Sequence, residues 1–259
     1  MQTIKIESRL PGLGHFLKNL PIFFEKEGIT LKKGRNEIKI FDYGEFRLCV
    51  KAFKKVTIFN RMMYSCFRKT KAQRSYEIAK KLLRKGIDTP QPLGYIIVKG
   101  KWAIIRQNYY ISIFNNHHFT LSDVLNGKHP KDQEQILKEY AEWMALDIHP
   151  KGILHEDMSA GNVLIIKNEN GNFSFSLIDL NRIKIKKRIS HRQGIRNLRK
   201  INNRPSVLAF LAEHYAYVAK GNPGRYAFFL IGSQLLFAHM RRITKGFLHS
   251  LAPKKEIRC

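Results

Sequence analysis

The sequence is short of acidic residues. It has 20 Asp and Glu against 47 Lys and Arg in 259 residues, which gives a formal net charge of +27. After Asp179 the only acids are Glu213 and Glu256, against 18 Lys and Arg. A field of this sign attracts anionic partners such as nucleic acid, acidic lipid or phosphorylated glycan. A merely soluble basic surface is the alternative, although solubility is usually served by mixed charges.

Cysteine is also scarce. Cys49, Cys66 and Cys259 are scattered, with no CxxC pair and no zinc-site spacing. Isolated cysteines in odd number indicate a reducing compartment rather than a disulfide framework. The stretch MQTIKIESRL lacks a basic segment followed by an apolar one, so we expect no signal peptide.

Long hydrophobic runs are missing as well. The most apolar stretch, residues 226–240, contains Gly232, Ser233, Gln234 and His239, whereas a membrane span needs roughly 20 predominantly apolar residues. We expect a buried helix there, with insertion into a membrane interface as the alternative. Because 44% of the residues are hydrophobic and 11% aromatic, the chain as a whole is expected to fold.

The GxGxxG pattern of a phosphate-binding loop is absent too. Residues 1–30 are weakly patterned, and we assign them no function. Residues 29–53 alternate between apolar and polar side chains and predict an antiparallel meander of three strands. The first turn of the meander contains Gly34, whose neighbouring backbone amides are a candidate phosphate contact.

Lys51 lies in the third of these strands. Alternation places it on one face with Cys49, opposite Leu48 and Val50. A lysine with apolar neighbours either extends to water or meets an acid and a phosphate. We therefore take Lys51 as a candidate nucleotide-binding cation.

A helix is predicted over residues 71–85. Glu77 lies beside its apolar side, and we expect it to face Lys51. An exposed glutamate that pairs with Lys80 or Lys81 is the alternative. Basic residues crowd the start of this helix, which the helix dipole disfavours, so an external anion is expected there. The candidates for that anion site are Arg68 and Lys69.

The following segments predict a division into two lobes. Strands are expected at residues 95–98 and 103–106, with residues 107–110 as the link between lobes. Helices are expected at 120–126, 132–148, 205–219 and 225–245. The fold class is thus α+β, with an N-terminal lobe of antiparallel sheet plus one helix (residues 1–108) and a mainly helical C-terminal lobe (residues 109–259).

The strongest functional signal is the pattern His-x-Asp-x-x-x-x-Asn, formed by His155, Asp157 and Asn162. An Asn-Gly turn at residues 170–171 then joins two apolar runs, which predicts a β-hairpin. The hairpin brings Asp179 back beside the loop. Two acids and an asparagine are therefore expected at one place.

That set of side chains is typical of phosphoryl transfer from a nucleotide. Such a reaction needs a divalent cation, and hard cations prefer carboxylate and amide oxygens. We expect Asp179 and Asn162 to bind the metal, Asp157 to orient the acceptor hydroxyl and accept its proton, and His155 to brace the loop by hydrogen bonds. A polar loop without catalytic meaning is the alternative.

Over residues 29–220 the chain resembles the protein-kinase-like superfamily, and within it the lipopolysaccharide kinase (Kdo/WaaP) family. The resemblance rests on three stretches: VKAFKK, YSCFRKTKAQRSYEIAKKLLRKGIDTPQPLGY, and LHEDMSAGNVL followed by LIDLNR. It implies a two-lobed protein-kinase-like fold. It also implies phosphorylation of an inner-core sugar of lipid A, Kdo or heptose, with ATP and Mg²⁺ as cofactors.

The resemblance implies a role for each candidate residue. Lys51 resembles the nucleotide lysine, Glu77 its helix partner, Asp157 the catalytic acid, and Asn162 and Asp179 the metal ligands. It further implies a cytoplasmic enzyme at the inner membrane of a Gram-negative bacterium. We expect peripheral association with the anionic membrane, no nucleic acid and no obligate protein partner.

Two further sites follow from the resemblance. Cys49 stands at the position that usually contacts adenine, so we expect it to be buried. Glycolipid access is expected from the basic segment at residues 182–204, with Arg188, Arg192 and Arg196 as candidate contacts.

The sequence departs from protein kinases in three ways. Ser159 stands where they usually have Lys, the sequence Asp179-Leu180-Asn181 lacks the usual Phe and Gly, and no Ala-Pro-Glu follows. These differences favour a small-molecule or glycolipid acceptor over a protein.

Three other functions stay open on sequence grounds. A nucleic-acid-binding module would explain the charge but not the candidate catalytic residues. An inactive kinase-like scaffold would keep the fold but is expected to lose the acids, which are present. A kinase for another small molecule, such as an aminoglycoside or another sugar, would keep both the fold and the acids.

Overall fold

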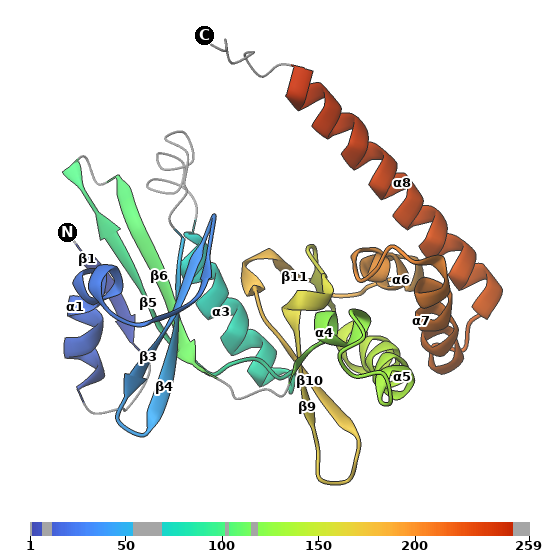
Figure 1. Cartoon of the computed structure of the whole chain (residues 1–259), viewed down its shortest axis with the longest axis horizontal. Coiled ribbons are helices and arrows are strands. Elements are labelled where there is room, and N and C mark those ends of the chain that lie inside the picture. Colours follow the sequence, from blue (N-terminus) through green and yellow to red (C-terminus); the bar gives the residue numbers. More distant parts are fainter. Residues whose placement is uncertain (1, 7–11, 54–68, 102–103, 115–118, 251–259) are drawn as a thin grey trace. The chain divides into compact units, whose positions relative to one another are not determined.

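The computed structural model describes most of the chain (Figure 1), namely residues 2–6, 12–53, 69–101, 104–114 and 119–250. It divides into two compact units. Unit 1 consists of Met1–Thr120 and Asn162–Ile183, and unit 2 of Leu121–Gly161 and Lys184–Cys259. The predicted boundary at residue 108 differs from this division, because it falls inside a strand and does not assign residues 162–183 to the first unit.

Unit 1 is built on a six-stranded antiparallel sheet in the order β1-β5-β6-β4-β3-β2 (Figure 1). Its strands are β1 (Gln2–Ile6), β2 (Ile29–Lys33), β3 (Glu37–Tyr43), β4 (Phe46–Ala52), β5 (Pro92–Lys99) and β6 (Ile105–Ile113). The predicted meander is confirmed as β2, β3 and β4. The predicted link at residues 107–110 is wrong, because these residues form the middle of β6.

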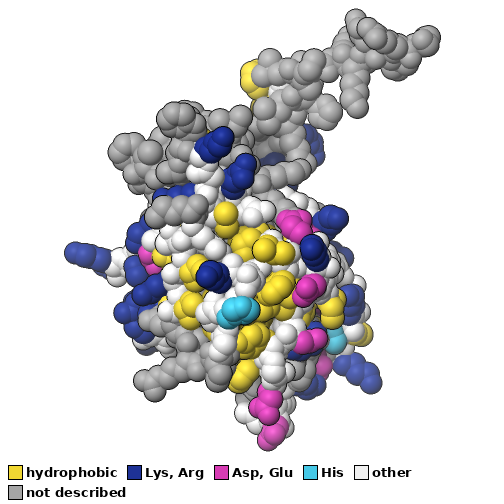
Figure 2. Space-filling view, turned by 90° about the vertical axis from the view of Figure 1, so that its left-hand side faces the viewer, with side chains coloured by type: hydrophobic (Ala, Val, Ile, Leu, Met, Phe, Trp, Pro, Cys, Tyr) yellow, Lys and Arg dark blue, Asp and Glu magenta, His cyan; other side chains and the backbone are white. Residues whose placement is uncertain are grey.

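One face of this sheet is covered by α1 (Leu13–Lys26). Leu13, Leu17, Leu20 and Phe24 recur at i, i+4, i+7 and i+11 and are all buried, so they form one buried face of the helix. Figure 2 shows the side of the molecule that carries α1, where hydrophobic side chains gather near the middle and Lys and Arg lie mainly around them. The weakly patterned N-terminal stretch therefore serves the core of unit 1.

The helix predicted at residues 71–85 is confirmed as α3 (Lys71–Arg84). It begins at Thr70, whose Oγ1 accepts a hydrogen bond from the amide of Gln73 at 3.1 Å, a typical N-cap. Its buried residues are Ala72, Ser75, Tyr76, Ala79 and Leu82. They pack the helix against β5 and β6.

The predicted hairpin is confirmed as β9 (Val163–Lys167) and β10 (Phe173–Leu177). Val163 pairs with Leu177, and Gly171 in the turn has a φ of 84°, which glycine adopts without strain. β7 (Phe119–Thr120) extends this sheet beside β9. Thr89 donates its hydroxyl hydrogen bond to the carbonyl of Leu177 at 2.7 Å and so fixes the end of the hairpin.

Unit 2 is mainly helical, as expected. Its elements are α4 (Leu121–Leu125), α5 (Gln133–Trp143), the π-helix η2 (Met144–Ile148), β8 (Ile153–His155), α6 (His191–Asn197), η5 (Leu198–Lys200), α7 (Pro205–Val218) and α8 (Pro223–Ser250). The short strand β11 (Ile183–Ile185) pairs with β8. The four predicted helices correspond to α4, α5 with η2, α7 and α8.

The expectation of a buried helix at residues 226–240 is correct only for one side of α8. Leu230 is fully buried and Gln234 is 9% exposed, and α8 packs against α7 and α6. In contrast, Phe228 is 83% exposed. Phe228 lies two residues from Leu230, and residues two apart on a helix point to different sides, so Phe228 belongs to the side of α8 that does not pack.

A row of apolar side chains on α8 remains exposed. Leu236, Met240, Ile243 and Phe247 recur at i, i+4, i+7 and i+11 and are each 54–63% exposed, so they share one face of the helix. We call these four residues the apolar stripe. Within the described part of the chain, no helix combines the length and apolar character needed to cross a membrane.

Candidate functional site

The register of the sheet in unit 1 places the candidate nucleotide residues on one face. Lys51 of β4 lies opposite Ile38 of β3 and Tyr110 of β6, and Cys49 lies opposite Ser112 of β6. Because side chains alternate along a strand, these residues point away from the core beneath α1. They line a cavity of about 160 Å³ that also contains Leu164 and Ile178 of the hairpin segment and is bounded entirely by residues of unit 1.

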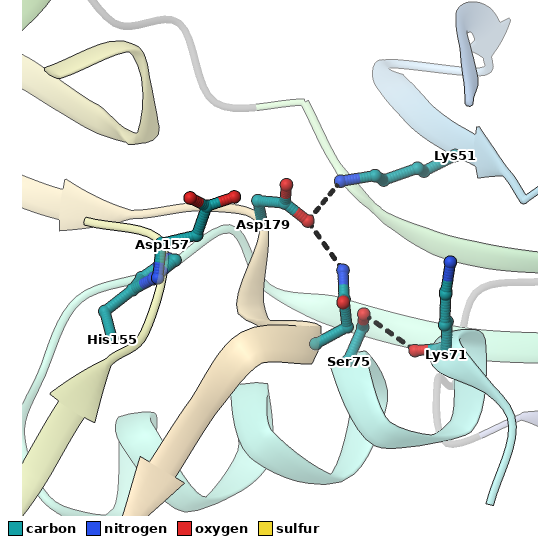
Figure 3. A network of polar contacts seen from close by, with 7 residues as sticks. Lys51, Lys71, Ser75, His155, Asp157 and Asp179 are labelled. Atoms are coloured by element: carbon teal, nitrogen blue, oxygen red, sulfur yellow. Dashed lines mark hydrogen bonds and ion pairs between the residues drawn. The ribbon is translucent and has the colours of Figure 1, made fainter. Parts of the chain in front are cut away.

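Lys51 and Asp179 meet at the wall of this cavity. The Lys51 Nζ atom donates a hydrogen bond to Asp179 Oδ1 at 2.7 Å, although the two residues are 128 positions apart (Figure 3). Their side chains are 14% and 25% exposed. Asn181 donates a second hydrogen bond to the same oxygen at 2.6 Å. The ammonium group thus has an acid partner beside an apolar cavity.

Asp179 has an unusual backbone. Its φ of 58° and ψ of 48° lie in the left-handed region, which non-glycine residues rarely adopt. Such conformations require about 1–3 kcal/mol and often occur at functional sites. The turn starts η4 (Leu180–Arg182), which packs against α3, so the surrounding structure holds the carboxylate in place.

Asn162 lies at the same end of the hairpin as Asp179. The carbonyl of Asn162 accepts the amide hydrogen bond of Ile178 at 3.0 Å, one step beyond the Val163–Leu177 pair. The backbone of Asn162 is therefore paired with Ile178, the residue directly before Asp179, so the two predicted metal ligands come from neighbouring chain segments. A carboxylate and an amide oxygen suit Mg²⁺, which is usually held by one or two carboxylates together with phosphate oxygens. Among the described residues there is no cluster of three or more His, Cys, Asp or Glu.

A second lysine, Lys71, belongs to the same surroundings. Figure 3 shows its side chain rising from the first turn of α3, on the side of that helix where Lys51 and Asp179 lie. Burial and the charges of Arg35 and Arg182 lower the pKa of Lys71, whereas Asp179 raises it and Lys51 lowers it further. One carboxylate thus faces several cations, an arrangement that suits a polyphosphate. Sequence reasoning missed Lys71, which it noted only as part of a basic helix start.

Glu77 does not meet Lys51. Its carboxylate accepts hydrogen bonds from Lys69 at 2.6 Å and Gln73 at 3.2 Å. The expected pair with Lys51 and the alternative pairs with Lys80 or Lys81 are therefore both wrong for this structure. The reason is geometric, because Ser75 takes the buried inward position of α3, where it is 2% exposed, and Glu77 follows at the flank.

The anion site predicted at Arg68 and Lys69 is only partly described. Arg68 lies outside the described residues. Lys69 is paired with Glu77 at 2.6 Å, so its charge is already balanced. The anion site at the start of α3 remains a hypothesis.

Cys49 and Gly34 both lie in unit 1. Cys49 lines the cavity and is half-buried rather than buried as expected. Its burial raises the pKa of the thiol to about 11 despite the nearby Lys51 charge, and the group stays a neutral thiol at pH 7. Gly34 lies in the open turn after β2, where an added Cβ would meet no atom nearer than 4.0 Å.

The candidate catalytic loop belongs to unit 2. His155 is fully buried, and its Nδ1 atom accepts the amide hydrogen bond of Asp157 at 3.2 Å. The carbonyl of His155 accepts a hydrogen bond from Asn197 Nδ2 at 2.7 Å. His155 thus contacts the loop in the bracing manner that the sequence suggested, with Asn197 as a support that sequence reasoning did not identify.

A second buried histidine extends this support. The His149 Nδ1 atom lies 2.8 Å from the Tyr215 hydroxyl, and its Nε2 lies 3.4 Å from Asn197 Oδ1. Burial lowers the pKa of His149 to about 4, although the contact with Asn197 raises it slightly. His149 is thus neutral at pH 7 and can share hydrogen bonds with its neighbours without a buried charge.

Asp157 is paired with a lysine from η5. The Lys200 Nζ atom donates hydrogen bonds to Asp157 Oδ1 at 3.0 Å and to the carbonyl of Glu156 at 2.8 Å. An ammonium group therefore stands beside Asp157 although Ser159 replaces the lysine usual in protein kinases. In the sequence, the only feature that pointed to Lys200 was the density of basic residues at 182–204.

The three arginines expected to contact the glycolipid lie on unit 2. Arg188, Arg192 and Arg196 are all exposed. Arg188 precedes α6, whereas Arg192 and Arg196 lie one turn apart on it, so the latter two share a face. Their contact with glycolipid remains a proposal.

The sequence profile of the Lipopolysaccharide kinase (Kdo/WaaP) family matches residues 47–218. This match covers about two thirds of the chain, and the chain belongs to this family. Among curated proteins, none matches the chain significantly.

Three solved structures are similar to the chain, and the first of them supports the fold. A structure described as WaaP in complex with acyl carrier protein is similar at a TM-score of 0.59 and 13% identity, over 91% of this chain and 99% of that one. Aminoglycoside phosphotransferase APH(4)-Ia gives a TM-score of 0.45 at 14% identity, over 91% and 93%. MAP kinase LmaMPK10 from Leishmania major gives 0.43 at 12% identity, over 78% and 62%. The chain has the α+β, protein-kinase-like fold expected from its sequence.

Proposed function

We propose that this lipopolysaccharide kinase family member transfers the γ-phosphoryl group of ATP to a hydroxyl of Kdo or heptose in the inner core. Membership of a kinase family supports phosphoryl transfer from ATP. The observation that carries the proposal is the Lys51–Asp179 ion pair at the wall of an apolar cavity. An apolar cavity suits a purine ring, and the lysine suits the phosphates that follow it.

The residues of unit 1 would bind the nucleotide. Lys51 would hold the phosphates, with Lys71 as an additional cation and Cys49 and Leu164 against the base. Asp179 and Asn162 would hold Mg²⁺, which when bound neutralises phosphate charge. Asn181 would keep the Asp179 carboxylate oriented through its 2.6 Å hydrogen bond. Gly34 would add backbone amides at the phosphates.

Asp157 of unit 2 would accept the proton of the acceptor hydroxyl. The hydroxyl oxygen forms the new bond to the γ-phosphorus, the bond from that phosphorus to the β–γ bridging oxygen breaks, and ADP leaves with the electron pair. A positioned general base contributes typically 10²–10⁴-fold. His155 and Asn197 would hold the loop at the right place through the backbone of residues 155–157.

Membrane association would be peripheral, at the cytoplasmic face of the inner membrane. The apolar stripe of α8 lies exposed, and Arg241 and Arg242 lie exposed on the same helix. A basic helix with an apolar face is typical of binding in the plane of an anionic membrane interface. Arg188 and Arg192 would add electrostatic attraction beside the glycolipid.

We also propose that no protein partner is obligatory. The solved WaaP structure contains acyl carrier protein, so the point can be tested directly. The chain expressed and purified alone should elute as a single species and transfer phosphate. Activity that appears only with a co-purified protein would contradict this part of the proposal.

The whole function is tested by mass spectrometry of the lipopolysaccharide core from cells with and without the gene. We expect the loss of one phosphate on an identified Kdo or heptose residue, restored by the wild-type gene but not by Asp157→Asn. An unchanged core, or a purified enzyme that phosphorylates an aminoglycoside and not the core, would contradict the proposal.

A further inference from the structure

Four cationic side chains line a pocket of unit 2 that has no role in the proposed reaction so far described. Lys186, Arg196, Arg199 and Lys200 line a cavity of about 250 Å³ together with Asn197 and Glu156. We call it the basic pocket. All of its lining residues belong to unit 2. It is formed by the loop before Asp157, by the segment after β11, and by α6 with η5.

The charges of the basic pocket are not balanced within it. Glu156 is its one lining acid, and Glu156 pairs with Lys184 at 2.5 Å. Among the described residues, neither Lys186 nor Arg196 has a carboxylate within ion-pair distance. Burial and the neighbouring charge of Arg196 lower the pKa of Arg199. Like charges held together in a concave site concentrate a field that attracts an anion.

Two of the four cations are held in place before any ligand binds. The guanidinium of Arg199 and the ammonium of Lys200 lie over the ring of Phe237 of α8, at 4.9 and 5.2 Å from its centroid. Such cation–π contacts limit the motion of long side chains. Preorganised donors lose less entropy on binding, so the pocket is suited to recognition rather than to solvation alone.

Lys200 connects the pocket to the candidate catalytic acid. Its ammonium group lines the pocket and also donates to Asp157 Oδ1 at 3.0 Å. An anion bound by Arg196, Arg199 and Lys200 would therefore contact a side chain, Lys200, that also contacts Asp157. A hydroxyl on the same sugar would then be close to the group that accepts its proton.

We propose that the basic pocket binds an anionic group of the acceptor, a sugar carboxylate or a phosphate, and so positions its hydroxyl at Asp157. This inference rests on the proposed function. The small volume of the pocket, about 250 Å³, favours a single anionic group. A flat membrane surface would instead meet the apolar stripe, and a nucleic acid backbone would need an extended groove with stacking aromatic rings.

The test uses the full chain with the Arg196→Gln/Arg199→Gln double variant. We expect its KM for detergent-solubilised lipid A–core to rise about 100-fold, because two charge-assisted hydrogen bonds are lost at about 10-fold each. The KM for ATP should stay within about twofold, since the nucleotide cavity lies in unit 1. The control, Arg204→Gln/Arg225→Gln, removes the same charge from exposed residues of unit 2 outside the pocket and should keep the wild-type acceptor KM.

Two modified acceptors identify the anion. One is core with its Kdo carboxyl groups reduced to alcohols, and the other is core freed of phosphate. The wild type should lose affinity for the acceptor that lacks the recognised group, whereas the double variant should treat it like intact core. Equal acceptor KM values for the double variant, the control and the wild type would overturn the pocket while leaving phosphoryl transfer standing.

A separate readout covers the case in which no transfer to core occurs. Inorganic phosphate at constant ionic strength should raise the Tm of the wild type and the control but not that of the double variant. That response without transfer would support the anion site and contradict the proposed function. Equal responses in all three proteins, or a single-stranded oligonucleotide that displaces phosphate and binds more tightly than core, would overturn the proposal.

Discussion

The cavity of unit 1 has one central cation already matched by a carboxylate, whereas the basic pocket of unit 2 has four cations and only Glu156 among its lining acids. The first is mainly apolar and the second mainly polar. A matched pair keeps a site ordered until a ligand with its own counter-ion arrives. In the basic pocket Lys200 is paired with Asp157, but Lys186 and Arg196 have no such partner among the described residues, and a cluster of this kind favours a ligand that itself brings negative charge. On the proposed function, the nucleotide would be recognised by fit and the acceptor by charge.

The largest effect is expected in unit 2, at Asp157. Asp157→Asn keeps the size of the side chain and its hydrogen bond from Lys200, but it removes the proton acceptor. Turnover should fall by roughly 10²–10⁴-fold if Asp157 is the general base. Steady-state kinetics with saturating ATP and core measure this, and near-normal kcat would exclude that role.

The matching test in unit 1 is Asp179→Ala. The substitution leaves Lys51 without its acid partner and removes a proposed metal ligand, so Mg²⁺-dependent ATP binding should weaken by at least about 100-fold. Calorimetric titration of ATP with and without Mg²⁺ measures the loss. Asp42→Ala, which removes an exposed acid of the same unit, should bind as the wild type does. Unchanged ATP affinity in Asp179→Ala would contradict the metal assignment.

Acid should distinguish the two regions through His149. Its pKa is about 4 in the folded protein against an ordinary value of 6.5, so the unfolded chain binds the proton more readily between these values. The contribution of His149 to the free energy of unfolding is therefore fully present above pH 6.5. It is lost as the pH drops through 4, by about 3 kcal/mol in total. Urea unfolding at pH 7 and pH 4.5 measures this fall.

His149→Gln serves as the control for that measurement. It removes the titrating group, so its unfolding free energy should depend less steeply on pH than that of the wild type. Parallel pH dependences of the two proteins would show that His149 is not the source.

The smallest predicted effect concerns the membrane surface. Arg188→Gln/Arg192→Gln removes two exposed charges of unit 2, each worth about 1 kcal/mol near an anionic membrane, so binding to anionic vesicles should weaken about 30-fold. Co-sedimentation with vesicles of phosphatidylglycerol measures this. Lys131→Gln/Lys138→Gln on the α5 side should change binding little. If both double variants bind alike, these arginines do not face the membrane.

Local patterns in the sequence predicted much of the fold. The Asn-Gly turn fixed the register of β9 and β10, and the 71–85 periodicity located α3 within one residue. The link at residues 107–110 was misplaced because Tyr109, Tyr110 and Ile111 are all buried in β6, and a strand buried on both faces shows no alternation.

The site shows where such reasoning ends. Lys51 and Asp179 were chosen by residue type and spacing, and the structure brings them to 2.7 Å. Neither the Glu77–Lys69 pair nor the Lys200–Asp157 pair followed from the sequence. The first pair depends on which side chain of α3 faces inward, and the second depends on a contact between residues 43 positions apart. Periodicity gives the face of a helix only to within about one residue.

The central claim is tested most directly by incubating the purified chain with Mg²⁺, γ-labelled ATP and lipid A–core, followed by mass spectrometry of the isolated sugars. The account predicts one labelled phosphate on a Kdo or heptose hydroxyl with the wild type, and none with Asp157→Asn, which should still bind ATP. ATP binding without any transfer to the core by the wild type, or equal transfer by Asp157→Asn, would contradict it.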